Sequence, residues 1–189
     1  MAYVTLAQIR QHGDYDPGDT GQDAEISALI PRAQSAIESY TNNVFEISAV
    51  STRVFDAPTA RTASTDDEYD KLYFDNWLAS TTDLVITNGD ATTVTGTDYV
   101  TLPRNHTPIY GIELKSDSDV SWEYDTSPES AISIEGYWGY SITPPSDVVL
   151  ACMQLVLHWL RVESQAVSKD MPDDVCMLLK PFKRKVQWL

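Results

Sequence analysis

The chain has 189 residues, of which 42% are hydrophobic and 22% are charged. This length fits one domain or one domain with a large insertion, and the composition favours a packed core over disorder. No apolar run approaches the roughly 20 residues that span a bilayer, and the N-terminus lacks the features of a signal peptide. We therefore expect a soluble, unexported protein with no membrane contact.

The formal net charge of −15 is unevenly distributed. Residues 44–144 hold 17 acidic and 5 basic residues, whereas residues 145–189 hold 5 acidic and 6 basic ones. Four of these basic residues fall within the last ten positions. Because binding to DNA relies on basic groups that release counterions, the acidic middle is expected to face DNA without adhering to it.

Two helices are predicted in residues 1–43. The first covers residues 5–12, with Thr5 as its N-cap. The second extends from Asp23, its expected cap, to about Thr41, because apolar residues recur there at helical spacing. Pro31 lies inside this helix and removes one hydrogen bond, so we expect a kink or a short break. Asn42-Asn43 is expected to end the helix.

The hydrophobic period changes to two between residues 44 and 143. Short runs rich in Val, Ile, Thr, Tyr and Trp alternate with turn residues, which is typical of a small antiparallel sandwich or barrel. Asn88-Gly89 predicts a type I′ hairpin turn, in which both central residues need positive φ. The acidic stretch 59–70 is expected to form an exposed loop. The predicted strands are Val50–Asp56, Lys71–Phe74, Asp83–Thr87, Tyr99–Leu102, Ile109–Leu114, Val120–Tyr124 and Ala131–Gly136.

Helical spacing returns after Pro144-Pro145. Ser146 is expected to cap a helix to about Val162 that is apolar nearly all round and therefore central. A last helix is predicted from Pro172, with Pro181 ending or bending it. The sequence thus predicts an α+β protein. Its small helical bundle core comprises residues 1–43 and 145–189, and a large antiparallel β-sandwich or barrel-like insertion occupies residues 44–144.

Catalytic and metal-binding motifs are lacking in the sequence. The three histidines stand in unrelated contexts, and no G-x-S-x-G, phosphate-binding loop, H-E-x-x-H or C-x-x-C motif occurs. Cys152 and Cys176 lie in apolar helical segments, so reduced buried thiols are expected, with a disulfide as the alternative. We expect no enzyme activity, no cofactor and no metal; a site assembled from scattered residues is the alternative.

Two segments suggest contacts with other molecules. Tyr137, Trp138 and Tyr140 either seal the seam between the two domains or form a patch that binds a sugar or a protein. The C-terminal segment alternates positive charge with large apolar side chains, which suits docking on a partner. Its residues are Phe182, Lys183, Arg184, Lys185, Val186, Gln187, Trp188 and Leu189. The alternatives are a packed tail and contact with nucleic acid or a membrane.

Three stretches resemble the phage head-tail connector, or adaptor, family found in siphophages and gene transfer agents. The first is DAEISALIPRAQSAIESYTNNVF, which is similar to the family's opening helix. The second is SIEGYWGYSITPPSDVVLACMQLVLHWL, which resembles its strand, glycine-aromatic turn, Pro-Pro and long apolar helix. The third is MPDDVCMLLKPFKRKVQWL, which is similar to its usual ending. The specificity comes from their combination and order.

The resemblance implies a structural virion protein in the neck of a tailed phage or phage-like particle, assembled in the host cytoplasm. It implies a homo-oligomeric ring of twelve beneath the portal protein, next to a stopper or other neck protein, with DNA passing through without sequence-specific binding. It also implies that the C-terminal segment docks on the portal. Alternatives are another neck or tail component, such as a stopper or tail-end cap, and a carbohydrate- or protein-binding module using Tyr137, Trp138 and Tyr140.

Overall fold

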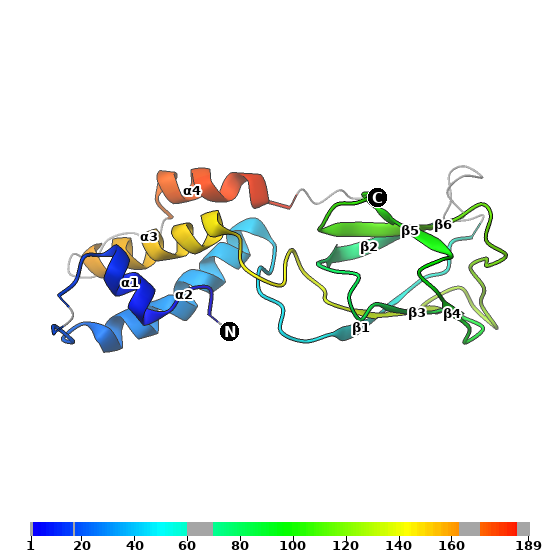
Figure 1. The fold of residues 1–189 in the computed structure, drawn as a ribbon, viewed down its shortest axis with the longest axis horizontal. Helices are drawn as coiled ribbons and strands as arrows, with labels where there is room; N and C mark the ends of the chain where they lie inside the picture. Colours follow the sequence, from blue (N-terminus) through cyan, green and yellow to red (C-terminus); the bar gives the residue numbers. More distant parts are fainter. Residues whose placement is uncertain (1, 17, 60–69, 163–170, 185–189) are drawn as a thin grey trace. The chain divides into compact units, whose positions relative to one another are not determined.

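The computed structural model describes residues 2–16, 18–59, 70–162 and 171–184, and the chain forms two compact units. The helical unit combines Met1–Glu46 with Thr143–Leu189, and the β unit comprises Ile47–Ile142. The chain therefore leaves the helical unit after α2, builds the β unit, and returns through α3 (Figure 1). This architecture confirms the predicted α+β class.

The helical unit contains α1 (Leu6–His12), α2 (Asp23–Thr41), α3 (Ser146–Val162) and α4 (Asp173–Leu179). A 3₁₀ turn, η3 (Lys180–Phe182), follows α4. Thr5 caps α1 as predicted, and its side chain and that of Gln8 form a reciprocal capping box. The helix α3 lies at the centre, because α1, α2 and α4 all pack against it. Its apolar residues are buried on several sides: Val148, Ala151, Cys152, Leu155, Val156, Leu157, Trp159 and Leu160.

Two expectations for α2 need correction. Asp23 does not cap the helix, because α2 begins at Asp23 itself and Gln22 stands at the N-cap without a side-chain hydrogen bond. The Asp23 carboxylate instead accepts a hydrogen bond from Arg10 of α1, so it links two helices. Pro31 causes no break, since α2 is continuous through it. Asn42 ends the helix as predicted, in a left-handed conformation with φ 54°.

The β unit consists of two antiparallel sheets. One has the strand order β1-β7-β3-β4 and the other the order β2-β6-β5. The strands β5 and β6 match the prediction residue for residue, and β1, β3 and β7 match within two residues at each end. The short strand β4 was not predicted, and β2 is longer than expected. The strands are β1 (Ser51–Phe55), β2 (Lys71–Leu78), β3 (Val85–Thr87), β4 (Thr93–Val94), β5 (Tyr99–Leu102), β6 (Ile109–Leu114) and β7 (Ile132–Gly136).

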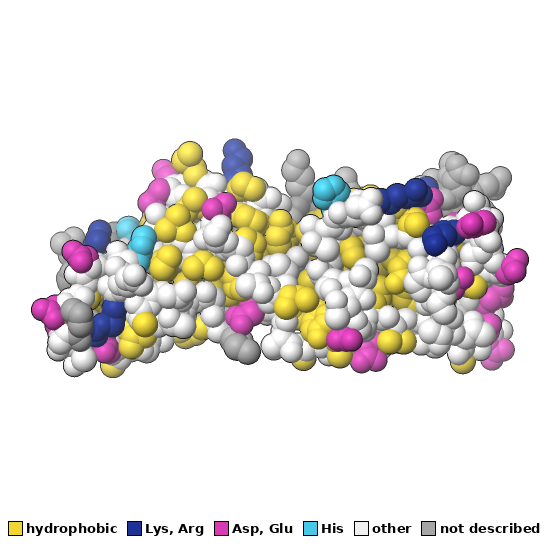
Figure 2. All heavy atoms as spheres, viewed as in Figure 1, with side chains coloured by type: hydrophobic (Ala, Val, Ile, Leu, Met, Phe, Trp, Pro, Cys, Tyr) yellow, Lys and Arg dark blue, Asp and Glu magenta, His cyan; other side chains and the backbone are white. Residues whose placement is uncertain are grey.

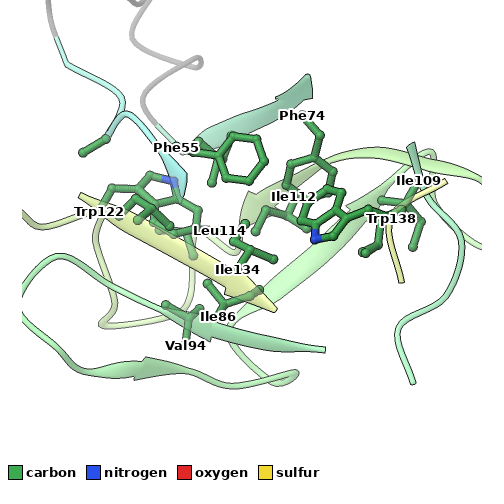
Figure 3. Close-up of a cluster of buried hydrophobic side chains, with 14 residues drawn as sticks. Phe55, Phe74, Ile86, Val94, Ile109, Ile112, Leu114, Trp122, Ile134 and Trp138 are labelled. Carbon is green, nitrogen blue, oxygen red and sulfur yellow. The ribbon is translucent and has the colours of Figure 1, made fainter. Parts of the chain in front are cut away.

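Aromatic and aliphatic side chains of both sheets meet in one core (Figure 3). The indole of Trp138 contacts the rings of Phe55 and Phe74 at centroid distances of 5.5 and 5.1 Å, and these two rings contact each other at 5.4 Å. Ile134 of β7 and Ile112 of β6 are completely buried and come from opposite sheets. Strand alternation explains this arrangement, because every second side chain faces the partner sheet. The β unit is therefore an antiparallel sandwich.

The predicted hairpin forms with a different turn. The strands β3 and β4 pair through Thr87 and Thr93, which leaves a five-residue connection, 88–92, in place of a two-residue one. Neither Asn88 nor Gly89 has positive φ, whereas Ala91 does, at 67°. The type I′ prediction was therefore wrong. Asn88 is only 3% exposed, because its side chain has another partner.

That partner is the predicted strand Val120–Tyr124, which forms no strand. The Asn88 amide donates to the carbonyl oxygen of Ser121 at 2.8 Å and accepts from the backbone amide of Glu123 at 2.9 Å. A side chain thus supplies two hydrogen bonds of the kind that a neighbouring strand would make, and the backbone amide of Gly89 donates a third, of 3.1 Å, to the carbonyl oxygen of Glu123. The segment still contributes Trp122 to the core, which explains its alternating sequence.

Candidate partner-docking surfaces

The start of the predicted docking tail is fixed to the end of α2. The backbone amide of Arg184 donates a hydrogen bond of 2.8 Å to the carbonyl oxygen of Thr41. The side-chain amide of Asn43 donates to the carbonyl oxygen of Phe182. Because the last carbonyl groups of a helix have no partner within the helix, the chain after η3 satisfies one that α2 leaves open. We call these two contacts the C-terminal clamp.

Side chains reinforce the C-terminal clamp. The ring of Phe182 meets Phe45 edge-on at a centroid distance of 5.8 Å, and Phe45 meets Tyr3 in the same way at 6.0 Å. The Lys183 ammonium lies 4.6 Å from the centroid of the Tyr40 ring, in a cation–π contact. The residues from Phe182 to Arg184 are therefore part of the helical unit's structure.

Tyr3 completes this network from the N-terminal side. Its hydroxyl accepts a hydrogen bond of 3.0 Å from the backbone amide of Phe45 and donates one of 2.7 Å to Glu38. Burial strongly raises the pKa of Tyr3, because the phenolate would lose its hydration there. The phenol therefore stays protonated and able to donate to Glu38 throughout the physiological pH range.

The remaining tail residues, Lys185, Val186, Gln187, Trp188 and Leu189, lie outside the described residues. Within the predicted segment, the described residues Phe182, Lys183 and Arg184 all contact the helical unit. Sequence reasoning treated Asn43 only as a helix stop and missed its contact with Phe182. A signal for this contact was present in the sequence. Asn42 alone is enough to end the helix, so the second Asn, Asn43, has no capping role of its own.

The predicted aromatic patch is mostly internal. Trp138 is 6% exposed, and its Nε1 donates a hydrogen bond of 2.9 Å to the carbonyl oxygen of Ser51. The guanidinium of Arg53 lies 5.3 Å from its ring centroid. Tyr137 and Tyr140 are half-buried, and burial raises the pKa of Tyr140. Trp138 is thus a core residue of the sandwich and offers no exposed ring to a sugar.

A different aromatic pair lies on the outer face of the sheet β2-β6-β5. Tyr73 and Tyr110 are 40% and 41% exposed, and their rings stack with an interplanar angle of 12° and a centroid distance of 6.3 Å. Trp77 meets Tyr110 edge-on at 6.4 Å. Sequence analysis missed this pair, although the alternation of Leu72, Tyr73 and Phe74 assigns Tyr73 to the face opposite the core.

Basic residues gather on the same outer face. A hollow of about 670 Å³ is lined by Lys71, Arg104 and Lys115, which are three of the five basic residues in positions 44–144. The carboxylates of Asp70, Glu113 and Asp117 line it as well, so the charges balance there. Figure 2 shows Lys and Arg side chains close together on the β unit, with Asp and Glu spread around them.

Catalytic features do not emerge in the described part of the chain. No group of three or more His, Cys, Asp or Glu side chains there is placed to hold a metal ion. Within the same residues, no helix combines the length and apolarity needed to cross a membrane. Both cysteines are free, and burial raises the pKa of Cys152 to about 12. His12 and His158 line one hollow of about 280 Å³ in the helical unit, a proximity that the sequence did not reveal.

Comparison with known protein families identifies the chain. Residues 5–171 match the family model described as "Head completion protein". The chain belongs to the head completion protein family. This membership confirms the sequence-based recognition of a phage head-tail adaptor family and makes the chain a structural virion protein, not an enzyme. It connects head and tail in a tailed phage or phage-like particle.

Solved structures support the fold of this head completion protein. A chain in the neck of an empty gene transfer agent particle, computed with C6 symmetry, is 16% identical and has a TM-score of 0.59, covering 99% of this chain and 92% of that chain. A chain in the native neck, computed with C12 symmetry, is 16% identical with a TM-score of 0.55, covering 97% and 90%. One in the native gene transfer agent virion is 18% identical with a TM-score of 0.58, covering 99% and 92%.

No curated protein sequence matches the chain significantly. At these identities the structural matches show the shared fold, which includes both the helices and the β insertion because nearly the whole chain is covered. The head completion family is thus recognised from the sequence, and the fold from the structural likeness.

Proposed function

We propose that this head completion protein forms a ring, of about twelve copies, that joins the portal protein to the next component of the neck. Family membership supports the place in the particle. The ring is supported by the related folds in necks computed with C6 and C12 symmetry. The proposed partners are further copies of the chain, the portal protein, and a stopper or other neck protein.

The C-terminal segment is proposed to dock on the portal. The observation that carries this proposal is the C-terminal clamp, which fixes Arg184 to the end of α2. The five residues that follow contain Lys185, Val186, Trp188 and Leu189, and they start from a defined point on the helical unit. Five residues reach at most about 17 Å. An aromatic and aliphatic anchor on so short a tether suits a pocket in an adjacent protein.

DNA is proposed to pass through the ring without sequence-specific contact. The β unit's sequence holds far more acidic than basic residues, and the three basic residues in the 670 Å³ hollow are balanced by three carboxylates. Like-charge repulsion would therefore keep DNA from adhering to this unit. The exposed fraction of Trp138, at 6%, weighs against the glycan-binding alternative.

Co-sedimentation with the portal protein of the same particle tests this function. We would compare the full chain, a chain ending at Arg184, and a full-length Trp188→Ala variant. The chain ending at Arg184 keeps the C-terminal clamp, so a loss of binding reports on the tail and not on folding. Circular dichroism of all three provides the control.

We expect the full chain to bind near one copy per portal subunit, Trp188→Ala to bind at least tenfold more weakly, and the chain ending at Arg184 not to bind. If the shortened chain binds as well as the full chain, the tail is not the anchor. If the full chain does not bind at all, the proposed portal-joining function is wrong.

A further inference from the structure

The two outer faces of the β sandwich differ in chemistry. On the sheet β2-β6-β5, the exposed pair Tyr73 and Tyr110 lies beside Lys71 and Arg104; we call these four residues the aromatic face. Tyr73 lies opposite Gly111 in the β2–β6 register, where a glycine leaves room for a flat ring. Tyrosine and arginine are enriched at protein interfaces, because they combine large contact area with polar groups.

Charge on the aromatic face sets it apart from the rest of the β unit. Lys71 pairs with Glu113 in the β2–β6 register, and Arg104 forms an exposed ion pair of 3.4 Å with the same carboxylate. The hollow on this face thus holds both charges, because Lys71, Arg104 and Lys115 line it together with Asp70, Glu113 and Asp117. Since positions 44–144 hold 17 acidic and 5 basic residues, the aromatic face is where a further acidic surface approaches at low electrostatic cost.

The outer face of the sheet β1-β7-β3-β4 is aliphatic with a carboxylate. Val54 and Val85 are 58% and 44% exposed, although their neighbours Phe55 and Ile86 are core residues. Glu135 of β7 lies between β1 and β3, opposite Thr52 of β1 and Val85 of β3. We call Val54, Val85 and Glu135 the aliphatic face. These three residues include one carboxylate and no basic group.

We propose that the aromatic face of one copy packs against the aliphatic face of the next copy, and so joins the β units head to tail around the ring. The occupant of each face is a second copy of this chain. Tyr73 and Tyr110 would cover the exposed Val54 and Val85, and Glu135 would meet Lys71 and Arg104. This inference rests on the ring in the proposed function.

Geometry and charge both favour this pairing over a symmetric one. The two faces belong to opposite sheets of one sandwich, so they point in nearly opposite directions. A closed ring of many copies needs such a heterologous contact, in which each subunit uses two different patches. Pairing two aromatic faces would oppose Lys71 and Arg104 with their own copies, and pairing two aliphatic faces would oppose the Glu135 carboxylates.

Cross-linking tests the contact on full-length chains in a Cys176→Ser background. Cys152 can remain, because it is buried. One chain carries Tyr110→Cys and another carries Val85→Cys, and a short bismaleimide is added with and without the portal ring. We expect covalent dimers from the mixture and none from either variant alone. A chain with both substitutions should give a ladder of oligomers.

Equal cross-linking in the single-variant samples would overturn the head-to-tail contact, as would the absence of a ladder from the double variant while portal binding persists. A ladder without portal binding would support the contact and contradict only the portal-joining function. Loss of both the ladder and portal binding would contradict the two proposals together.

A charge reversal is the second test. Arg104→Glu should reduce ring occupancy on the portal at least fivefold, and Glu135→Arg in the same chain should restore it. Failure of that rescue, with both variants folded, contradicts the pairing.

Discussion

The backbone amide of Arg184 lies 2.8 Å from the carbonyl oxygen of Thr41, so the fourth helix and the turn after it are held at the end of α2. The two residues are 143 positions apart in the chain, and the whole β unit lies between them. A hydrogen bond that closes such a long segment joins the two halves of the helical unit. The C-terminal clamp therefore makes the residues up to Arg184 part of the helical unit's structure.

Shortening the chain at two points should separate this structural role from the proposed docking of the tail. A chain ending at Leu179 loses the contacts of Phe182, Lys183 and Arg184, and we expect its helical unit to be destabilised by about 2–4 kcal/mol. A chain ending at Arg184 should unfold at the same urea concentration as the full chain, within error. Urea denaturation followed by tryptophan fluorescence checks this. Equal midpoints for all three chains would contradict the structural role of the clamp.

Asn43→Ala should show the contribution of one contact. The substitution removes the side-chain donor to the Phe182 carbonyl oxygen at a position that is 5% exposed, so a loss of about 1–3 kcal/mol is expected. Asn42→Gly is the matched control, because Asn42 has φ 54° and glycine adopts this conformation without strain. The control should be unchanged or slightly more stable. Thermal unfolding of the two variants is measured side by side. An Asn43→Ala variant as stable as Asn42→Gly would contradict the contribution of the Asn43 contact.

Elements with a clear hydrophobic period could be predicted from the sequence. The helix α2 and the strands β5 and β6 were found because their apolar residues recur at 3.6 or 2 positions, and that period reports directly on burial. The central place of α3 followed from apolar residues on several sides. Family recognition came from the order of three segments, and the match over residues 5–171 confirms it.

Features that depend on contacts between distant residues could not be predicted. Val120–Tyr124 has the alternation of a strand, but its backbone is bonded by the Asn88 side chain, which no local pattern encodes. The Asn88-Gly89 turn was assigned wrongly for the same reason, since the tertiary bonds of Asn88 override its turn preference. Trp138 was left between a seal of the domain seam and a binding patch, because a run of aromatic residues has the same sequence pattern in a core and in a surface patch.

Trp138→Ala should destabilise the β unit strongly. The substitution removes a 6% exposed indole that packs on Phe55 and Phe74, and large core aromatics replaced by alanine lose about 3–5 kcal/mol. Tyr137→Ala is the control, because Tyr137 is half-buried and its hydroxyl has only an exposed 3.3 Å contact with Asp83. It should lose less than half as much. Guanidinium titrations measure both, and similar losses would contradict the core placement of Trp138.

Asn88→Ala should release the segment around Trp122. The alanine leaves the Ser121 carbonyl oxygen and the Glu123 amide without the Asn88 partner, and we expect a loss of about 2–4 kcal/mol for the two hydrogen bonds. Asp90→Asn is the control, since Asp90 lies in the same connection and its carboxylate contacts only exposed Thr92 groups. Amide hydrogen exchange should show faster exchange at residues 120–124 in Asn88→Ala alone. Unchanged protection of the amides at residues 120–124 would contradict the role of the Asn88 side chain in holding this segment.

Alkaline pH should destabilise the helical unit through its buried acids. Burial raises the pKa of Cys152 from 9.0 to about 12, and it also raises that of Tyr3. A group with a raised folded-state pKa binds its proton more tightly in the folded chain, so its stabilising effect is complete below the unfolded-state pKa. This effect is lost as pH rises from about 9 toward 12, by up to about 1.4 kcal/mol per pH unit for Cys152. Cys152→Ala should flatten this dependence, although it also removes core volume. The two chains are therefore compared by the slope of the unfolding free energy against pH between pH 8.5 and 10.5, and not by its absolute value. An unchanged slope would show that Cys152 does not contribute to the pH dependence.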